Sequence, residues 1–527
     1  MYDYIIVGAG SAGCVLAHRL SEDPGARVLL IEAGPPDSAA FIHMPAAFAG
    51  LFRSATDWDL ATAWEPQLGN RRVFLPRGKT LGGSSSLNAM IYIRGNRADY
   101  DEWADLGWGY DAMLPAFKKA EDNERGASEY HGAGGPLPVS DSRPQTGLSE
   151  AFLESAGAHG MPFNEDFNGA EQDGAGWYQL TVRAGRRGSA AAAYLHPVMA
   201  RPNLTVETDL HVHRVLFEGS RAVGVEGSRL GELLSFRCEG EVIVSAGAYC
   251  SPQILTLSGL GRPDELALLQ IPVVAESPEM GLGLQDHPTC GCIYATDEPV
   301  SLRDAMTEES IDAWAQQGTG PLSSNGVESG GFLRTRDGLP APDVQLHMVA
   351  AVYQQEGLVP SVDHGFTLSA CVLKPRSRGQ VAVVSPDPTT KPMIAHNYLA
   401  EPDDMRSLIE GVRQVMAICR EQPLARYAER ALMVPASDGD EDIREFIRLS
   451  AQTIYHPTSS CRMGSDATSV VDPELRVRGV EGLRVVDASV FPSVVRGNTN
   501  APVIALAERA AEMIRAGAPA VAEAATL

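Results

Sequence analysis

Glycines and a carboxylate near the N-terminus are spaced for binding a dinucleotide. A predicted strand over Tyr4–Val7 leads into a GxGxxG turn that opens a helix, and Glu32 ends the next predicted strand. Gly8 permits the tight turn, Gly10 lets the backbone approach a pyrophosphate, and Gly13 lets the helix pack closely on its strand. Glu32 can accept hydrogen bonds from an adenosine ribose, and it would repel the 2′-phosphate of NADP. The motif does not separate FAD from NAD, and a glycine-rich turn in another βαβ unit is the alternative interpretation.

Three later segments add residues that suit a bound cofactor. Paired glycines followed by serines in Gly78–Gly95 can wrap backbone closely around a flat or phosphorylated ligand, although a structural loop has the same composition. Gly247–Gly261 follows a strand and predicts a helix that ends in glycines. A third strand, Leu483–Val486, leads to Asp487, and Asn500 is placed to cap the C-terminal helix.

The elements that position these residues fall into two groups. Strand-then-helix patterns recur at the N-terminus, around Gly240–Leu257 and around Leu483–Ile514, whereas Ala341–Val384 alternates as in an antiparallel sheet. We therefore expect a nucleotide-binding domain assembled from separated segments, with a second domain inserted between them and ligand chemistry at their interface. The expected segments are 1–145, 182–293 and 452–527 for the first domain, and 146–181 and 294–451 for the second.

Composition excludes several classes of partner. The chain has 527 residues, 44% hydrophobic and 21% charged, which is ordinary for a globular protein. Its formal net charge of −24 disfavours nucleic acid and anionic membrane surfaces. No run of eighteen apolar residues predicts a transmembrane segment, and the first strand begins too early for a secretory signal. The eight scattered cysteines lack metal-ligand spacing, so we expect no metal. Free thiols suit a reducing compartment, so we expect a cytoplasmic location. Peripheral membrane association remains an open alternative.

Together these segments resemble the glucose–methanol–choline (GMC) oxidoreductase family of FAD enzymes over essentially the whole chain. Gly78–Asp101 and Gly247–Gly261 are similar to two signature stretches of that family, and Gly283–His287 and Tyr455–Gly464 to further landmarks. Among the members, the chain looks most like bacterial alcohol and sorbose dehydrogenases, and it is also similar to choline dehydrogenases and hydroxymethylfurfural-type alcohol oxidases. The resemblance implies an α/β FAD-binding domain of the Rossmann-like GMC type plus an α+β substrate domain with an antiparallel sheet.

The resemblance also implies which residues hold FAD. Around the adenosine diphosphate we expect Gly8, Gly10, Gly13 and Glu32, with Val212 at the adenine. Along the flavin we expect Gly82, Gly83, Asn88, Ala89 and Met90. Asp487 and Asn500 are expected at the ribityl–pyrophosphate and isoalloxazine regions. Some members attach FAD covalently through a histidine at the position of Leu87. Non-covalent FAD is therefore expected.

For catalysis, the resemblance implies His456 as the base and Asn498 as its partner. Oxidising an alcohol requires removal of the hydroxyl proton and transfer of a hydride, which flavin N5 accepts in this family. A neutral histidine suits the first task near pH 7, and an asparagine can hydrogen-bond the developing alkoxide without competing for its proton. His287 is interpreted as structural, and His347 is the alternative base.

Four functions remain open at this stage. The first is oxidation of an alcohol, with electrons passed to a quinone or another non-NAD acceptor, and the second is an oxidase that makes H2O2. A hydroxynitrile-type lyase and a non-catalytic FAD-binding protein are the alternatives from other classes. The expected pocket segment Gly320–Phe332 suits polyols, primary aliphatic alcohols or aryl alcohols equally, and Glu328 either attracts a cation such as choline or is solvated or paired.

Overall fold

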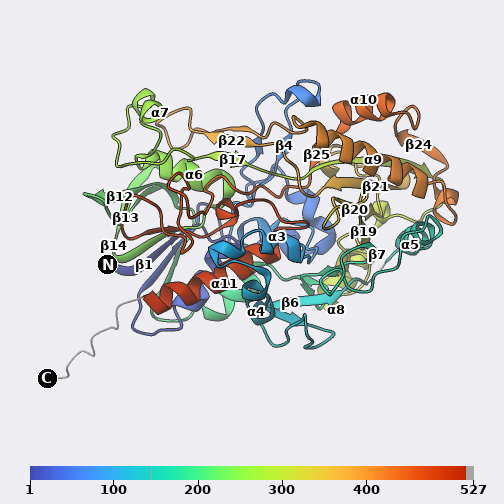
Figure 1. Ribbon diagram of the computed structural model, residues 1–527. Coiled ribbons are helices and arrows are strands. Elements are labelled where there is room, and N and C mark those ends of the chain that lie inside the picture. Colours follow the sequence, from blue (N-terminus) through green and yellow to red (C-terminus); the bar gives the residue numbers. More distant parts are fainter. Residues whose placement is uncertain (144, 518–527) are drawn as a thin grey trace.

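The first large sheet carries the N-terminal glycine turn and combines segments that are far apart in the sequence (Figure 1). The computed structural model describes residues 1–143 and 145–517. In spatial order the strands are β11 (Leu204–Glu207), β2 (Val28–Ile31), β1 (Tyr2–Val7), β14 (Glu232–Val244), β13 (Arg221–Arg229) and β12 (His211–Glu218), and β26 (Leu483–Val485) also pairs with β14. Strands β11, β2, β1, β14 and β26 run parallel. Every residue of β2 is buried, as is typical of a parallel strand covered on both faces.

Two helices from opposite ends of the chain pack beside this sheet. Helix α1 (Ser11–Leu20) begins directly after the glycine turn, and α11 (Asn500–Gly517) lies against it. Arg19 donates two hydrogen bonds of 2.8 Å to the buried Glu508 carboxylate, and both are charge-assisted. This ion pair fixes the C-terminal helix on the N-terminal one, with the start of both helices near the same edge of the sheet.

The second large sheet is antiparallel throughout and lies on the other side of the molecule in Figure 1. In spatial order it contains β24 (Arg430–Met433), β18 (Pro288–Thr296), β21 (His364–Val372), β20 (Val344–Val349), β19 (Ser329–Leu333) and β7 (Gly174–Trp177), with β25 (Gln452–Thr453) also on β18. Helix α9 (Pro402–Ile418) packs on this sheet. The helix starts with proline and two aspartates, which suit the first turn and its positive dipole end.

Shorter elements complete the fold. The remaining helices are α2 (Ala40–His43), α3 (Arg97–Asp101), α4 (Tyr110–Ala120), α5 (Leu148–Ala158), α6 (Gly247–Leu257), α7 (Pro263–Leu268), α8 (Glu308–Gln317) and α10 (Asp440–Ser450). The remaining strands are β3 (Leu60–Ala61), β4 (Phe74–Leu75), β5 (Glu121–Asn123), β6 (Leu137–Asp141), β8 (Gln179–Leu180), β9 (Val182–Arg183), β10 (Arg186–Arg187), β15 (Leu260–Gly261), β16 (Ala275–Glu276), β17 (Leu282–Leu284), β22 (Gly379–Ala382) and β23 (Met393–Ala395). In the part of the chain that the structure describes, no helix combines the length and the apolar character needed to cross a bilayer.

The predicted fold class is confirmed by a parallel nucleotide-binding sheet and a separate antiparallel sheet. Strands β20 and β21 pair as expected, but β22 joins β17 and β23 in a third, smaller sheet. The division into two domains stays a proposal, and strand pairing bears on two of its boundaries, since β25 at the start of the expected 452–527 segment also pairs with β18. All of β18 belongs to the antiparallel sheet, so a boundary at residue 293 would cut one strand, and we place it before Pro288.

Candidate active site

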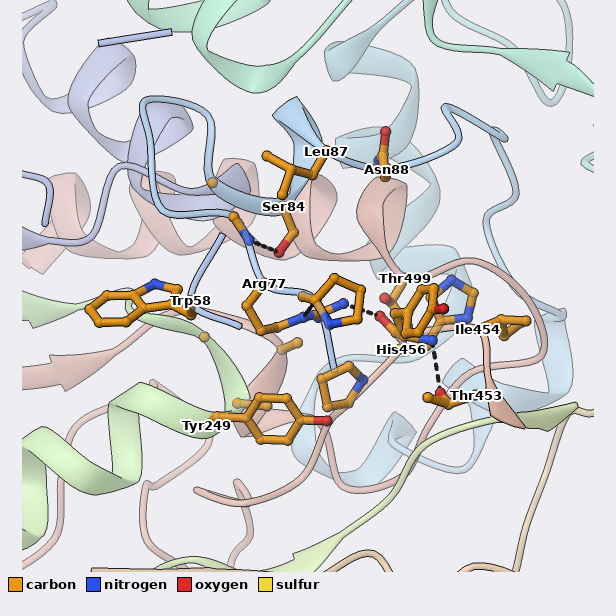
Figure 2. Close-up of a pocket in the computed structure, with 18 of the residues that line it drawn as sticks. Trp58, Arg77, Ser84, Leu87, Asn88, Tyr249, Thr453, Ile454, His456 and Thr499 are labelled. Atoms are coloured by element: carbon orange, nitrogen blue, oxygen red, sulfur yellow. Dashed lines mark hydrogen bonds between the residues drawn. The ribbon is translucent and has the colours of Figure 1, made fainter. Parts of the chain in front are cut away.

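One cavity of about 750 Å³ is lined by residues from both large sheets (Figure 2). This volume lies within the usual range for ligand-binding pockets. All of the site residues predicted from the sequence line it except Gly13 and Gly82. The cavity therefore brings together the N-terminal turn, the glycine-serine loop and the C-terminal segment.

The glycine turn has the geometry that a pyrophosphate requires. Gly8 has a φ of +98°, and a Cβ on Gly13 would lie 1.9 Å from the Gly8 carbonyl oxygen, so helix α1 packs directly on the end of β1. A Cβ on Gly10 would meet no protein atom closer than 4.0 Å, so the space beside this residue is open to the cavity. The hydroxyl of Ser245, another lining residue, is buried without a hydrogen-bond partner among the described residues. These observations fit a phosphate-bearing cofactor.

Glu32 occupies the adenosine end of the cavity. Its carboxylate accepts hydrogen bonds of 2.9 Å from the backbone N–H groups of Ala9 and Gly34, and each oxygen keeps a second lone pair. Burial raises the pKa of Glu32 to about 7. Val212 in β12 lines the same cavity, together with Trp58. A ribose hydroxyl donating to Glu32 would complete the hydrogen bonding of this carboxylate.

The glycine-serine loop lies directly against the N-terminal turn. Its left-handed residues include Gly82, Gly83 and Met90. A Cβ on Gly83 would lie 2.7 Å from Gly10 Cα, so only glycine allows the two backbones to approach so closely. Asn88 accepts a 3.1 Å hydrogen bond from the Met90 N–H, and Asn88 and Ala89 both line the cavity.

Asp487 and Asn500 connect the C-terminal segment to this site. The buried Asp487 carboxylate accepts hydrogen bonds from Gly247 N–H at 2.9 Å and Ser251 Oγ at 2.5 Å, and burial raises its pKa. Asn500 is the first residue of α11 rather than the cap that we predicted before it. Its Oδ1 accepts a 2.7 Å hydrogen bond from Ser11 Oγ at the start of α1. Both side chains line the cavity between the two helix starts.

The ring of His456 is held by a hydrogen-bond chain that fixes its tautomer. His287 Nε2 lies 2.9 Å from the Leu373 carbonyl oxygen, which only accepts, so Nε2 of His287 carries the proton. In neutral His287, Nδ1 is then an acceptor, and it lies 2.9 Å from His456 Nδ1. His456 must therefore be protonated on Nδ1, which leaves its Nε2 unprotonated.

The environment also keeps His456 neutral. Burial lowers its pKa well below the usual value, and electrostatic interactions with His287, His347 and Arg77 lower it further. Its backbone N–H donates to Asp286 Oδ1 at 2.6 Å, which anchors the main chain behind the ring. The side chain is thus an unprotonated base at neutral pH.

Asn498 is oriented toward this base. Its Nδ2 lies 3.3 Å from His456 Nε2, and its Oδ1 accepts a 3.4 Å hydrogen bond from Gln345 Nε2. Gln345 Nε2 also contacts Tyr178 Oη at 3.1 Å. The amide of Asn498 therefore presents its N–H groups, rather than its oxygen, toward the base and the cavity.

Sequence reasoning missed part of this arrangement. His287 was interpreted as structural, yet it contacts the base directly; its place in the Gly283–His287 landmark was the available signal. Nothing in the sequence pointed to Gln345, a buried polar residue on a strand. His347, the alternative base, lines the cavity; its Nδ1 has no hydrogen-bond partner among the residues that the structure describes, and burial lowers its pKa to about 3.

The expected pocket segment Gly320–Phe332 contributes little to the cavity. Only Val327 of this stretch lines it. Glu328 is buried and accepts hydrogen bonds from Gln145 N–H, Ser149 Oγ and Ser324 Oγ. Of the two interpretations of Glu328, the structure supports the paired carboxylate.

Comparison with known proteins agrees with the geometry. Two family models described as GMC oxidoreductase match residues 2–289 and 375–507. The chain belongs to the GMC oxidoreductase family. It is 44% identical to an alcohol dehydrogenase [acceptor] of Pseudomonas putida (98% of this chain, 96% of the relative) and 45% identical to an oxygen-dependent choline dehydrogenase of Paraburkholderia xenovorans (98% and 94%). The crystal structure of pyridoxine 4-oxidase from Mesorbium loti superposes with a TM-score of 0.90 at 32% identity (98% and 100%).

Membership settles the general class of the protein. This GMC oxidoreductase is an FAD-dependent enzyme that acts on CH–OH groups, as expected from the sequence. The similar proteins include both dehydrogenases and oxidases, so the comparison leaves the substrate and the electron acceptor open.

Proposed function

We propose that this GMC oxidoreductase oxidises a primary alcohol to the aldehyde and passes the electrons to a quinone or another non-NAD acceptor. The observation that carries the proposal is the unprotonated Nε2 of His456, which faces the cavity beside the N–H groups of Asn498. A non-catalytic FAD-binding protein has no need of a buried histidine held as a base.

The cofactor site supports this proposal. Gly8, Gly10 and Glu32 would hold the adenosine diphosphate, with Val212 at the adenine, and Gly13 and Gly82 would act indirectly by shaping the backbone. The flavin and its ribityl chain would be held by Gly83, Asn88, Ala89, Met90, Asp487 and Asn500. Bound FAD would supply the hydride acceptor.

The protein's own residues would handle the proton and the charge. His456 Nε2 takes the hydroxyl proton of the alcohol, and its low pKa means that this nitrogen is free to do so at neutral pH. Asn498 donates an N–H to the oxygen as negative charge develops there. With bound FAD as the acceptor of the hydride from carbon, loss of the hydroxyl proton to His456 would leave an aldehyde.

Anaerobic mixing of the holoenzyme with a panel of primary alcohols tests this function directly. Loss of the visible flavin absorbance is expected, followed by recovery with a quinone or a dye faster than with O2. Rapid recovery with O2 and release of H2O2 would instead establish the oxidase alternative. Cleavage of a cyanohydrin without any change in flavin absorbance would establish a lyase.

The first prediction is that FAD is bound non-covalently. Leu87 lines the cavity with an aliphatic side chain that cannot bond to the flavin. Acid precipitation of the purified protein should leave all the yellow colour in the supernatant. Flavin that sediments with the denatured protein would contradict this expectation.

The second prediction concerns Glu32. Glu32→Ala removes both acceptors for the ribose and leaves the Ala9 and Gly34 N–H groups unpaired, so purified protein should contain much less FAD. Glu32→Gln retains one acceptor and should lose less. The ratio of flavin to protein absorbance after dialysis measures both, and full occupancy in Glu32→Ala would refute the assignment.

A further inference from the structure

The acidic and basic residues that line the cavity are distributed unequally. Among the described lining residues, the carboxylates are Glu32 and Asp487, and both accept backbone N–H groups at the dinucleotide end. Within residues 1–143 and 145–517, no other carboxylate lines the cavity. The same lining includes the guanidinium groups of Arg71 and Arg77.

Neither guanidinium is neutralised by an ion pair with a described carboxylate. Within the described part of the chain, Arg71 donates only to backbone carbonyls, among them Arg448 at 3.2 Å and Ala451 at 2.8 Å. Arg77 donates to the Tyr455 carbonyl at 2.7 Å, immediately before the base. Carbonyl partners satisfy the donors but leave the full positive charge, which arginine keeps at all accessible pH values.

The nearby acidic side chains do not offset this charge inside the cavity. Asp286 is buried behind the base, and its oxygens accept from His456 N–H, Tyr398 Oη and Thr453 Oγ1. Glu356 lies outside the lining; burial raises its pKa, and electrostatic interactions with Arg53 and Arg71 lower it. Glu328 is enclosed by its own hydrogen bonds, as described above.

We call the part of the cavity away from the dinucleotide end the substrate compartment, and its lining combines apolar residues with uncharged polar ones such as Gln354, Gln355 and Gln452. Phe48, Phe52, Tyr353, Met433 and Leu449 contribute to its walls. Aromatic rings can bind either an apolar group or a cation, so they do not decide between the two. Here Phe52 packs edge-to-face on Phe48 at 6.1 Å and on Tyr455 at 5.9 Å, and Arg71 places a positive charge in the same lining.

We propose that the substrate compartment selects uncharged alcohols with an apolar body and rejects quaternary ammonium alcohols such as choline, with Arg71 as a specificity-determining residue. This inference rests on the proposed function. The chain is about equally similar in sequence to an alcohol dehydrogenase and to a choline dehydrogenase. The proposed selectivity would distinguish this chain from the choline dehydrogenases.

Two alcohols of nearly the same shape provide the test. Choline and 3,3-dimethylbutan-1-ol differ in that the first carries a quaternary nitrogen where the second has a carbon. In anaerobic stopped-flow reduction of the holoenzyme, kcat/KM should be at least about 10-fold higher for the neutral alcohol, because a fixed charge repels the ammonium group in a poorly solvated cavity. Equal or higher efficiency with choline would overturn the inference. Flavin that no alcohol reduces would instead contradict the proposed function.

Charge variants identify the residue responsible. The ratio of kcat/KM for the neutral alcohol to kcat/KM for choline should fall several-fold in Arg71→Gln and further in Arg71→Glu. Arg71→Lys keeps the positive charge and should therefore keep the wild-type ratio. Tetramethylammonium should compete weakly with the neutral alcohol in the wild-type protein and more strongly in Arg71→Gln. A ratio that is the same in Arg71→Gln as in the wild type would show that Arg71 does not set this preference.

Discussion

Replacing His456 with alanine should slow the reduction of bound flavin by an alcohol about 10²–10⁴-fold, the usual cost of removing a general base. The physical reason is that His456 Nε2 is the unprotonated ring nitrogen of the His287–His456 pair that is available to a substrate, because the other one, His287 Nδ1, accepts from His456 Nδ1–H. Anaerobic stopped-flow absorbance in the visible flavin band measures this rate, and the flavin content should be unchanged.

Two comparisons make this experiment specific. Asn498→Ala should be less damaging, because one hydrogen bond to a developing charge contributes about 1.5–3 kcal/mol. In the wild type, kcat/KM should fall as the pH decreases through the pKa of His456, and because burial lowers that pKa, the plateau should extend well below pH 6.5. A near-normal rate in His456→Ala would place the base elsewhere, with His347 as the next residue to test.

The second large effect is expected at His287, which positions the base without touching the substrate. His287→Leu removes the acceptor for His456 Nδ1–H and leaves the Leu373 carbonyl unpaired. A buried group that loses its partner costs about 1–3 kcal/mol, so flavin reduction should slow roughly 10–100-fold. The measurement is the same stopped-flow rate, recorded as a function of pH.

The matched control at this position is His287→Gln. Its side-chain oxygen can accept from His456 Nδ1–H, so it should recover part of the rate that His287→Leu loses. The pH profile should also shift in His287→Leu, because the interaction with His287 contributes to the low pKa of His456. If leucine and glutamine variants have equal rates and an unshifted profile, His287 has only a packing role.

Local sequence patterns were enough to predict the residues at the cofactor end of the site. The glycine turn and Glu32 depend on contacts between residues close in sequence, so a strand, a turn and a helix determine their positions. The C-terminal residues Asp487 and Asn500 could be placed only through family resemblance, because their partners Gly247 and Ser11 are hundreds of residues away.

The substrate end could not be predicted in the same way. Glu328 stood in a segment expected to face the pocket, but its orientation depends on helix α5, which supplies Ser149 as a partner. Arg71 gave no sequence signal, since a single arginine carries no periodicity, and its partners lie near residue 450. Side chains that are oriented by distant backbone become visible only when the chain is folded.

The contact between α1 and α11 has a consequence for biosynthesis. Ser11 and Asn500 are separated by 489 residues, as are Arg19 and Glu508. At a synthesis rate of about 5–20 residues per second, the N-terminal glycine turn waits roughly 25–100 s for its helical partner. During that time the growing chain exposes the apolar face that α11 will cover, so aggregation and chaperone binding compete with folding. Cofactor loading on the complete site must follow release of the C-terminal helix from the ribosome, and abundance in a cell would depend on FAD supply at that late step.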